Sequence, residues 1–218
     1  MTKIIFKPEN IEGFDGFYWD ADDIGAWWGP LNDWNSSHRN VIERILRRGL
    51  VLQAGGNCGL YPVLLSKYFN RVVTFEPDKS NYEILVKNVE RHALNNVAKF
   101  NSALGETVRL AGLTKGPKDN VGMHRIDDGP GAQMVPMIAV DDIFANESVD
   151  FIWFDIELYE LNALKGAVET IERNKPLVMI ENRNHAIDVL MSDLGYIHLE
   201  DSKMDSIFGH KDVDYFSK

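Results

Sequence analysis

One stretch near the start of the chain constrains its fold more than any other: two apolar runs joined by a glycine-rich turn. Residues 50–52 predict a short buried strand, residues 60–69 have the apolar spacing of a helix, and residues 72–75 predict a second strand. The turn at residues 54–59 joins the first strand to the helix, and Glu76 ends the second strand. This order is typical of the first half of a nucleotide-binding α/β domain.

The turn supports more than one interpretation. Gly55, Gly56 and Gly59 let the backbone approach a ligand closely, and Glu76 follows at a distance where a carboxylate can bind a ribose diol. The spacing Ala54-x-Gly56-x-x-Gly59 also fits a loose dinucleotide fingerprint, so a nicotinamide-dependent oxidoreductase is an alternative. The simplest interpretation is a tight strand-to-helix turn without a ligand.

Composition narrows the class of protein. At 218 residues, with 44% hydrophobic and 26% charged residues, the chain is expected to form one soluble domain. A formal net charge of −10 argues against general nucleic-acid binding, because phosphate contacts need clustered Lys and Arg. One cysteine excludes an intrachain disulfide framework. Without a membrane-length apolar run or a signal-peptide core, the protein is expected in the cytoplasm, with no membrane contact.

Residues 1–48 precede the alternating pattern and are predicted to form an N-terminal cap segment. This segment interleaves aromatic residues with aspartates and contains four of the five tryptophans, Trp19, Trp27, Trp28 and Trp34. It could bury part of the sheet, form a homodimer contact, or line a site for sugars, since aromatic planes beside carboxylates suit polyhydroxylated ligands. Ser36 or Ser37 is expected to cap a helix over residues 38–48, with His38 at its surface.

Residues 49–218 are predicted to be a single α/β domain. Further strands are expected at residues 97–101, 149–154, 177–180, 196–199 and 206–208, with helices between them. A capping box at Ser80–Glu83 is expected to begin the helix after the second strand. This alternation predicts a parallel, doubly wound sheet with helices on both faces.

Residues 112–136 interrupt the alternation. They contain five glycines and three prolines and no periodicity, so we expect a loop over the functional site. Four polar residues in this loop are candidate ligand contacts: His124, Arg125, Asp127 and Asp128.

The carboxyl ends of parallel strands meet at one edge of a sheet, where such folds bind ligands. Five residues are expected to gather at that edge: Gly55, Glu76, Ser102, Asp155 and Glu181.

Several segments resemble a known family in order and spacing, the FkbM-type S-adenosylmethionine-dependent methyltransferases. They are QAGGNCGLYPVLLSKYF, VVTFEPDKSNYEILVKNVERHALNNV, NSALG, VPMIAVDDI, VDFIWFDIELYELNALKGA and PLVMIE, within residues 51–181. The resemblance implies the Rossmann-like class I methyltransferase fold, with a mostly parallel seven-stranded sheet whose last strand is antiparallel. It also implies methyl transfer from S-adenosyl-L-methionine, most often to an oxygen of a small molecule or a sugar.

The resemblance implies a set of cofactor-binding positions. The glycine turn would hold the methionine part of the cofactor, Glu76 the ribose hydroxyls, and residues 77–78 and 102–103 the adenine. Gln53 stands where the family usually has an acid near the cofactor's amino group. The implied set is Gln53, Ala54, Gly55, Gly56, Asn57, Gly59, Glu76, Pro77, Asp78, Ser102, Ala103 and Asp155.

A hydroxyl acceptor calls for a general base within hydrogen-bond reach. Asp155 is the preferred candidate because it would lie near the sulfonium and the acceptor, and His185 is second. Glu181 and His124 are further candidates, and Glu157 would line the site.

Two further hypotheses accompany this one. Asp155 with Glu181 and Asn182 resembles in placement the oxygen ligands of magnesium-dependent catechol-type O-methyltransferases, and hard oxygens suit Mg²⁺; we nevertheless expect no metal site. The family's lysine in the fourth strand is Trp153 here, and its glycine after the Asp-x-Glu motif is Leu158. With Gln53, these departures allow a catalytically inactive protein that binds a cofactor or a partner.

Overall fold

The computed structural model describes residues 3–6, 16–20, 23, 38–127, 129 and 132–217. Its main sheet has seven strands in the order β12-β13-β11-β10-β3-β4-β5. These strands are β3 (Leu50–Ala54), β4 (Arg71–Phe75), β5 (Val97–Phe100), β10 (Phe151–Phe154), β11 (Leu177–Ile180), β12 (Tyr196–Ser202) and β13 (Asp205–His210).

Five neighbouring strands pair in parallel, and β13 runs antiparallel to β11 and β12. This arrangement confirms the mostly parallel seven-stranded sheet implied by the family resemblance. It also differs from the all-parallel six-stranded order typical of dinucleotide-binding domains.

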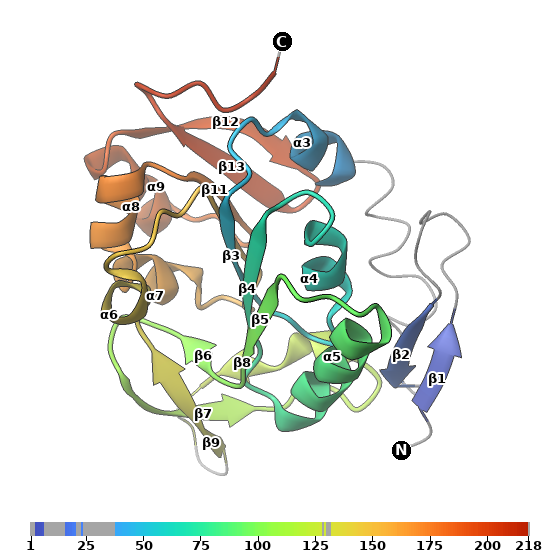
Figure 1. Cartoon of the computed structure of the whole chain (residues 1–218). Coiled ribbons are helices and arrows are strands. Elements are labelled where there is room, and N and C mark those ends of the chain that lie inside the picture. The colour runs from blue at the N-terminus through green and yellow to red at the C-terminus, as the bar shows by residue number, and fades with distance from the viewer. Residues whose placement is uncertain are drawn as a thin grey trace.

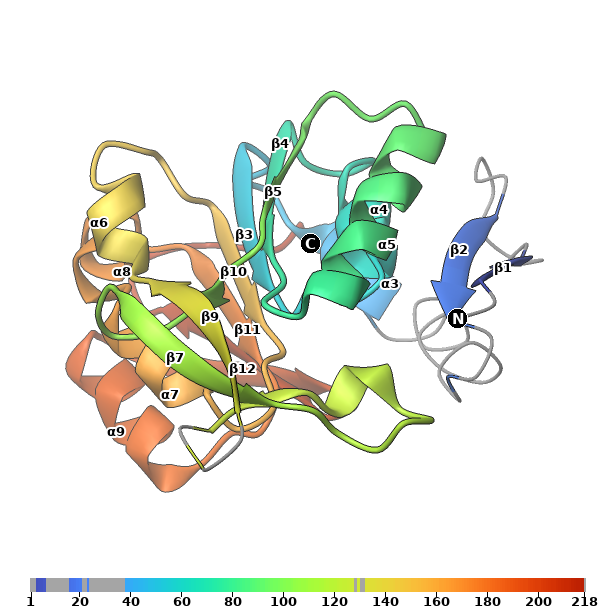
Figure 2. The ribbon, with the colours of Figure 1, turned by 90° about the horizontal axis from the view of Figure 1, so that it is seen from below.

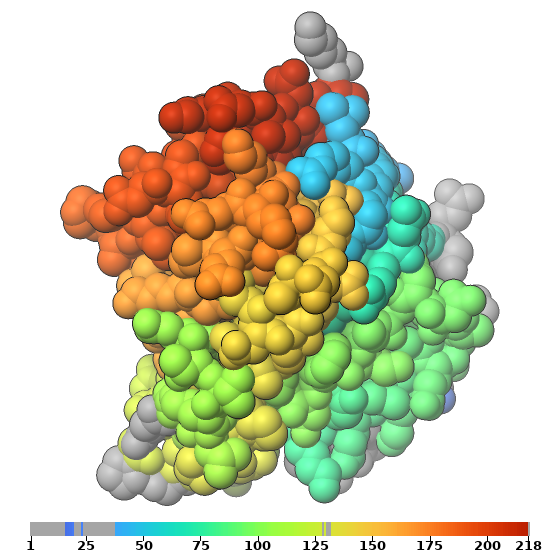
Figure 3. Space-filling view, turned by 60° about the vertical axis from the view of Figure 1, so that its left-hand side comes forward, coloured from blue at the N-terminus to red at the C-terminus, as the bar shows by residue number. Residues whose placement is uncertain are grey.

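Helices cover both faces of this sheet (Figure 1). On one face lie α3 (Arg39–Arg44), α4 (Leu60–Leu65) and α5 (Lys79–Arg91). On the other lie α6 (Val140–Phe144), α7 (Glu160–Lys165), α8 (Val168–Asn174) and α9 (His185–Asp193). The space-filling view shows α6 and α8, in yellow and orange, side by side at the surface (Figure 3).

The two faces form separate hydrophobic cores because successive strand residues point to opposite sides. Val51, Phe151 and Leu177 belong to the core under α3, α4 and α5. Their neighbours Leu52 and Ile152 belong to the core under the other four helices. Covered on both faces, the central strands are apolar almost throughout, as is typical of parallel sheets.

A second sheet replaces much of the loop predicted at residues 112–136, so this prediction is wrong in part. Its strands are β6 (Ala103–Leu104), β7 (Arg109–Thr114), β8 (Arg125–Ile126) and β9 (Gln133–Ile138), in the order β6-β9-β7-β8. Buried Val135 and Met137 alternate with exposed Met134 and Pro136 along β9. Glycine and proline hid this period-two pattern. Figure 2 shows this sheet beside the carboxyl end of the main sheet.

The described part of the N-terminal segment packs on a helix. Strands β1 (Lys3–Phe6) and β2 (Phe17–Asp20) pair antiparallel and lie beside α5 (Figures 1 and 2). The Tyr18 N–H donates to Asn88 Oδ1 at 2.6 Å, and Asn88 Nδ2 donates to the Tyr18 carbonyl at 2.9 Å. Trp27, Trp28, Trp34, Ser36 and Ser37 lie outside the described residues.

The first helix and the cap of α5 differ from the predictions. The first helix ends at Arg44 rather than 48, and His38 is buried rather than at the surface. The cap of α5 is Asp78, whose Oδ1 accepts from the N–H groups of Ser80 and Asn81 at 2.8 and 3.0 Å. Because Lys79 is already helical, Ser80 cannot serve as the cap residue.

Between β10 and β11 the chain forms two short helices, α7 and α8, separated near Gly166. None of the described helices has the length and apolarity needed to cross a bilayer.

Candidate active site

A cavity opens at the carboxyl edge of the main sheet, between the ends of β3, β4, β10 and β11 and the second sheet. It brings together most of the predicted site residues. Those lining it are Ala54, Gly55, Asn57, Glu76, Pro77, Ser102, Ala103, Asp155, Glu157, Glu181 and His124.

Other predicted site residues do not line this cavity. They are Gln53, Gly56, Gly59, Asp78 and His185. His185 is the exposed first residue of α9, and Asp78 caps α5. Arg125 is exposed and pairs with Asp127 at 3.5 Å, and Asp128 lies outside the described residues.

The glycine turn is shaped by close backbone contacts. Gly55 has a φ of 85°, and a Cβ there would lie 1.8 Å from the Asp155 carbonyl oxygen. Gly59 has a φ of 91°, and a Cβ there would lie 3.0 Å from the Leu85 Cα. Only glycine adopts both the conformation and the spacing without strain. This packing brings the end of β3 against Asp155, so the turn shapes the cavity whether or not it also binds a ligand.

The Gln53 side chain stabilises this turn through hydrogen bonds. Its Oε1 accepts from Thr74 Oγ1 at 2.5 Å, and its Nε2 donates to the Gly55 carbonyl at 3.1 Å. The side chain is fully buried. Gln53 therefore supports the turn from within the sheet, away from the cavity where the resemblance placed a cofactor contact.

Two backbone N–H groups hold the Glu76 carboxylate at the cavity wall. Asn57 N donates to Oε2 at 2.7 Å and Asp78 N donates to Oε1 at 2.8 Å. Burial raises the pKa of Glu76 to about 7, although these two hydrogen bonds favour the ionised form. Each carboxylate oxygen keeps further acceptor capacity for a ligand.

Three buried polar atoms around the cavity have no hydrogen-bond partner within the described part of the chain. They are Asn57 Oδ1, Ser102 Oγ and His124 Nδ1. Buried polar groups in folded proteins are nearly always hydrogen-bonded, so such atoms at one cavity indicate a polar ligand or water there. Burial lowers the pKa of His124, which favours the neutral imidazole. A ligand in the cavity would then meet an uncharged ring.

The opposite end of the cavity is acidic. Carboxylate oxygens of Asp155, Glu157 and Glu181 lie within 4.8 Å of one another. Burial, Glu181 and Asp205 raise the pKa of Asp155 well above its usual range, and Asp155 shares a hydrogen bond with Glu181. Burial and then Glu181 raise the pKa of Glu157 to about 7. These neighbours therefore disfavour full ionisation of the cluster.

The same three carboxylates could hold a divalent cation, since hard oxygens suit Mg²⁺. The sequence pointed instead to Asn182 as the third group beside Asp155 and Glu181. Asn182 Nδ2 donates to Glu181 Oε2 at 2.8 Å, so this amide supports the carboxylate.

A buried histidine–aspartate pair lies behind this cluster and was missed from the sequence. His38 Nε2 and Asp205 Oδ2 lie 2.6 Å apart, although 167 positions separate the two residues. Trp153, in place of the family's lysine, donates from Nε1 to Asp205 Oδ1 at 3.3 Å. The His38 ring packs against Trp153 and Tyr61, at centroid distances of 5.1 and 5.8 Å. No local sequence pattern signals a pairing over such a separation.

The backbone beside the acidic cluster is strained. Glu157, Leu158 and Asn182 have φ values of 53°, 73° and 53°. These left-handed conformations favour glycine. The position of Leu158, where the family has glycine, thus keeps the glycine-type conformation with a different side chain.

The comparisons agree with this architecture. The family model of the methyltransferase FkbM domain matches residues 58–198, so the chain belongs to this methyltransferase family. The curated proteins offer no match to the sequence. Family membership and the antiparallel β13 both argue against the nicotinamide-dependent alternative.

Among solved structures, the chain is similar to methyltransferase FkbM from Methylobacillus flagellatus KT. The identity is 22% and the TM-score 0.52, covering 79% of this chain and 45% of that one. This chain thus spans less than half the length of that methyltransferase.

A SAM-dependent methyltransferase from Aquifex aeolicus matches at 16% identity and TM-score 0.50, covering 86% of this chain and 93% of its own. The tRNA (uracil-54, C5)-methyltransferase of Pyrococcus abyssi, in complex with S-adenosyl-L-homocysteine, matches at 15% identity and TM-score 0.54. That match covers 95% of this chain and 43% of the other. Likenesses at these identities establish the fold, that of class I methyltransferases.

Proposed function

We propose that this protein transfers the methyl group of S-adenosylmethionine to a hydroxyl oxygen of a small-molecule or sugar-type acceptor. The observation that carries the proposal is the cavity itself. One end presents Glu76 and three unpartnered polar atoms, and the other presents the clustered carboxyl groups of Asp155, Glu157 and Glu181. Membership of a methyltransferase family supports the same conclusion.

The described residues fit the cofactor. Glu76 offers acceptor capacity on both oxygens for a ribose diol, and Asn57 lies beside it. Ser102 and His124 offer unpartnered polar atoms for an adenine, with Pro77 and Ala103 as apolar neighbours.

When bound, this cofactor supplies a methyl carbon already activated by the sulfonium. The protein then has two tasks, to align the acceptor oxygen and to take its proton. We assign the second task to Asp155 because it lines the cavity and its carboxylate lies within 4.8 Å of those of Glu157 and Glu181. Its raised pKa gives the ionised form a high affinity for the acceptor proton, and Glu181 can share that proton through their hydrogen bond.

The acidic end also bears on the acceptor. Carboxylates of Asp155, Glu157 and Glu181 accept hydrogen bonds from several hydroxyls at once, which suits a polyhydroxylated molecule. The proposal requires no metal ion, because an ionised carboxylate of the cluster can take the proton that the acceptor hydroxyl loses.

A cofactor-binding protein without catalysis is the second candidate, motivated by Gln53, Trp153 and Leu158. Gln53 braces the glycine turn and Trp153 binds Asp205, so both departures have structural roles that leave the cavity intact.

Transfer of a radiolabelled methyl group decides between these functions. We expect transfer from S-adenosylmethionine to members of a panel of sugars, polyols and phenols, and a much slower transfer in Asp155→Asn. Cofactor binding without transfer to any acceptor would support the inactive candidate, and absence of cofactor binding would overturn the proposal.

A further inference from the structure

A short segment roofs one end of the cavity. Residues 115–124, here called the strap, connect β7 to β8 and include the 3-10 turn η2 (Val121–Met123). Val121, Gly122 and His124 of the strap line the cavity, at the end where Glu76 and Ser102 lie. The strap therefore forms one side of the cavity, which the main sheet leaves open.

The strap depends on contacts with other elements for its position. Within it, Asn120 N donates to Pro117 O at 3.0 Å and Met123 N to Asn120 O at 3.3 Å. The Gly122 N–H also donates to Asn120 Oδ1 at 3.1 Å. Lys115 Nζ lies 3.0 Å from Asp78 Oδ2, which ties the strap to the start of α5. Few internal hydrogen bonds mean a low local stability, so external contacts decide where such a segment lies.

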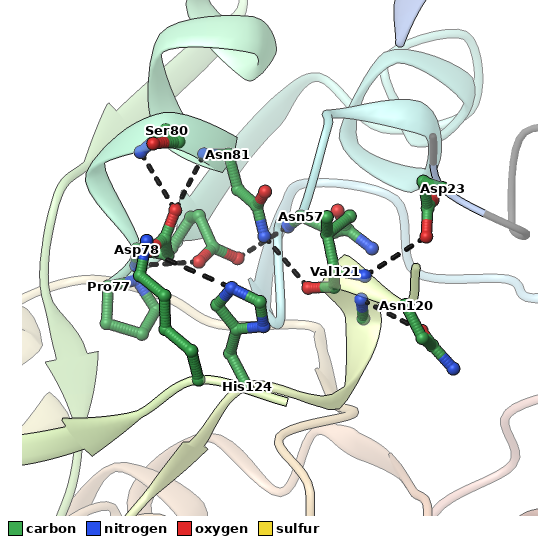
Figure 4. A network of polar contacts seen from close by, with 12 residues as sticks. Asp23, Asn57, Pro77, Asp78, Ser80, Asn81, Asn120, Val121 and His124 are labelled. Atoms are coloured by element: carbon green, nitrogen blue, oxygen red, sulfur yellow. Dashed lines mark hydrogen bonds and ion pairs between the residues drawn. The ribbon is translucent and has the colours of Figure 1, made fainter. Parts of the chain in front are cut away.

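The peptide groups of Val121 are held from two sides (Figure 4). Asn81 Nδ2 donates to the Val121 carbonyl at 3.0 Å, and the Val121 N–H donates to Asp23 Oδ1 at 3.0 Å. Asn81 belongs to α5, whereas Asp23 belongs to the N-terminal segment. The two contacts place Val121 between a rigid helix and a residue 98 positions earlier.

Asp23 is itself firmly placed. It is 2% exposed, and its Oδ2 accepts from Trp19 Nε1 at 2.6 Å. Trp19 lies in β2, which Asn88 fixes to α5 through two hydrogen bonds with Tyr18. A single buried carboxylate thus links the N-terminal segment to the roof of the cavity.

We propose that Asp23 is a positioning residue for the cofactor site, holding the strap so that His124 and Val121 close the adenosine end of the cavity. This inference rests on the proposed function, since it concerns how the same cavity retains S-adenosylmethionine. It assigns the N-terminal segment an indirect part in cofactor binding, through the strap. Cofactor release then requires the Asp23–Val121 hydrogen bond to open.

Asp23→Ala tests the proposal, with Asp119→Ala as the matched control. Asp119 is an exposed carboxylate in the same strap, so its removal changes the charge equally without touching Asp23. We expect Asp23→Ala to weaken S-adenosylmethionine binding about tenfold, through faster dissociation, as for loss of a hydrogen bond to a charged group. Asp119→Ala should bind like the wild type. Titration calorimetry and stopped-flow release measure the two quantities.

Hydrogen exchange of the cofactor-free protein separates local positioning from general destabilisation. We expect Asp23→Ala to accelerate exchange in residues 115–124 while the amides of the main sheet keep their protection. If Asp23→Ala does not fold, Trp19→Phe removes the indole donor to Asp23, together with part of a buried ring, and should accelerate strap exchange and cofactor release in weaker form.

Unchanged exchange in the strap, or unchanged cofactor affinity and release in Asp23→Ala, would overturn the proposal. Failure of the wild type to bind S-adenosylmethionine would instead contradict the proposed function. Hydrogen exchange in the strap of the cofactor-free protein would still test whether Asp23 positions it.

Discussion

Each end of the cavity contains an acid, buried Glu76 at one end and half-buried Asp155 at the other, but the surroundings of the two acids differ. Backbone N–H groups of Asn57 and Asp78 donate to Glu76 and favour its ionised form. Carboxylates surround Asp155 and favour its protonated form. Burial raises the pKa of both, so the neighbours make the difference. One end is suited to accept hydrogen bonds from a ligand. At the other end, the raised pKa means that Asp155, once ionised, binds a proton tightly.

The largest predicted effect is on the proton-accepting end. Asp155→Asn keeps the shape of the side chain and removes the base, so kcat should fall by roughly 10²–10⁴-fold, the usual contribution of a general base. Radiolabelled methyl transfer measures the rate. Affinity for S-adenosylmethionine, measured by calorimetry, should change by less than about tenfold. An unchanged kcat would assign the base to another residue.

The second prediction concerns the His38–Asp205 pair behind the acidic end. His38→Ala should lower the free energy of unfolding by about 3–5 kcal/mol, because it leaves a buried carboxylate without its histidine partner. The control is His198→Ala, which removes a histidine from a more exposed pair with Asp201 and should cost about 0–1 kcal/mol. Urea denaturation followed by circular dichroism compares the two; equal losses would contradict the assignment.

The third prediction concerns the hydrogen-bond-accepting end. With the pKa of Glu76 near 7, the carboxylate is mostly ionised at pH 8 and mostly protonated at pH 6. Only the ionised form can accept on both oxygens. The Kd for S-adenosylmethionine should therefore rise about tenfold as the pH falls from 8 to 6, in proportion to the loss of the ionised form. Glu76→Gln should flatten this dependence; a flat profile in the wild type would show that Glu76 does not titrate there.

The smallest predicted effect concerns the strained backbone beside the acidic end. Leu158→Gly should raise the free energy of unfolding by about 0.5–1 kcal/mol, because relief of a left-handed φ outweighs the entropy that glycine adds to the unfolded chain. Leu46→Gly is the control. Leu46 is similarly exposed but lacks a positive φ, so glycine there should destabilise. Thermal unfolding measures both, and a loss of stability in Leu158→Gly would contradict the strain.

The sequence predicted the sheet and much of the site for a shared physical reason. Apolar runs and glycine turns leave local patterns, and parallel strands bring their carboxyl ends to one edge. Glu76, Ser102, Asp155 and Glu181 could thus be placed together before any coordinates were known, and all four line the cavity.

The features that escaped prediction depend on contacts between distant residues. The His38–Asp205 pair and the Asp23–Val121 hydrogen bond span 167 and 98 positions and leave no periodic trace. The strands β7 and β9 were hidden because glycines and prolines, which favour turns, interrupt them.

Calorimetric titration of S-adenosylmethionine and S-adenosylhomocysteine into the wild type, Glu76→Ala and Glu83→Ala tests the central claim most directly. Glu83 is an exposed acid on α5 and serves as the control for the same substitution. We predict binding by the wild type and by Glu83→Ala, weakened roughly ten- to hundredfold in Glu76→Ala, as for lost hydrogen bonds to a charged group. Absence of binding by the wild type, or equal affinities in all three proteins, would contradict the assignment of this cavity to the cofactor.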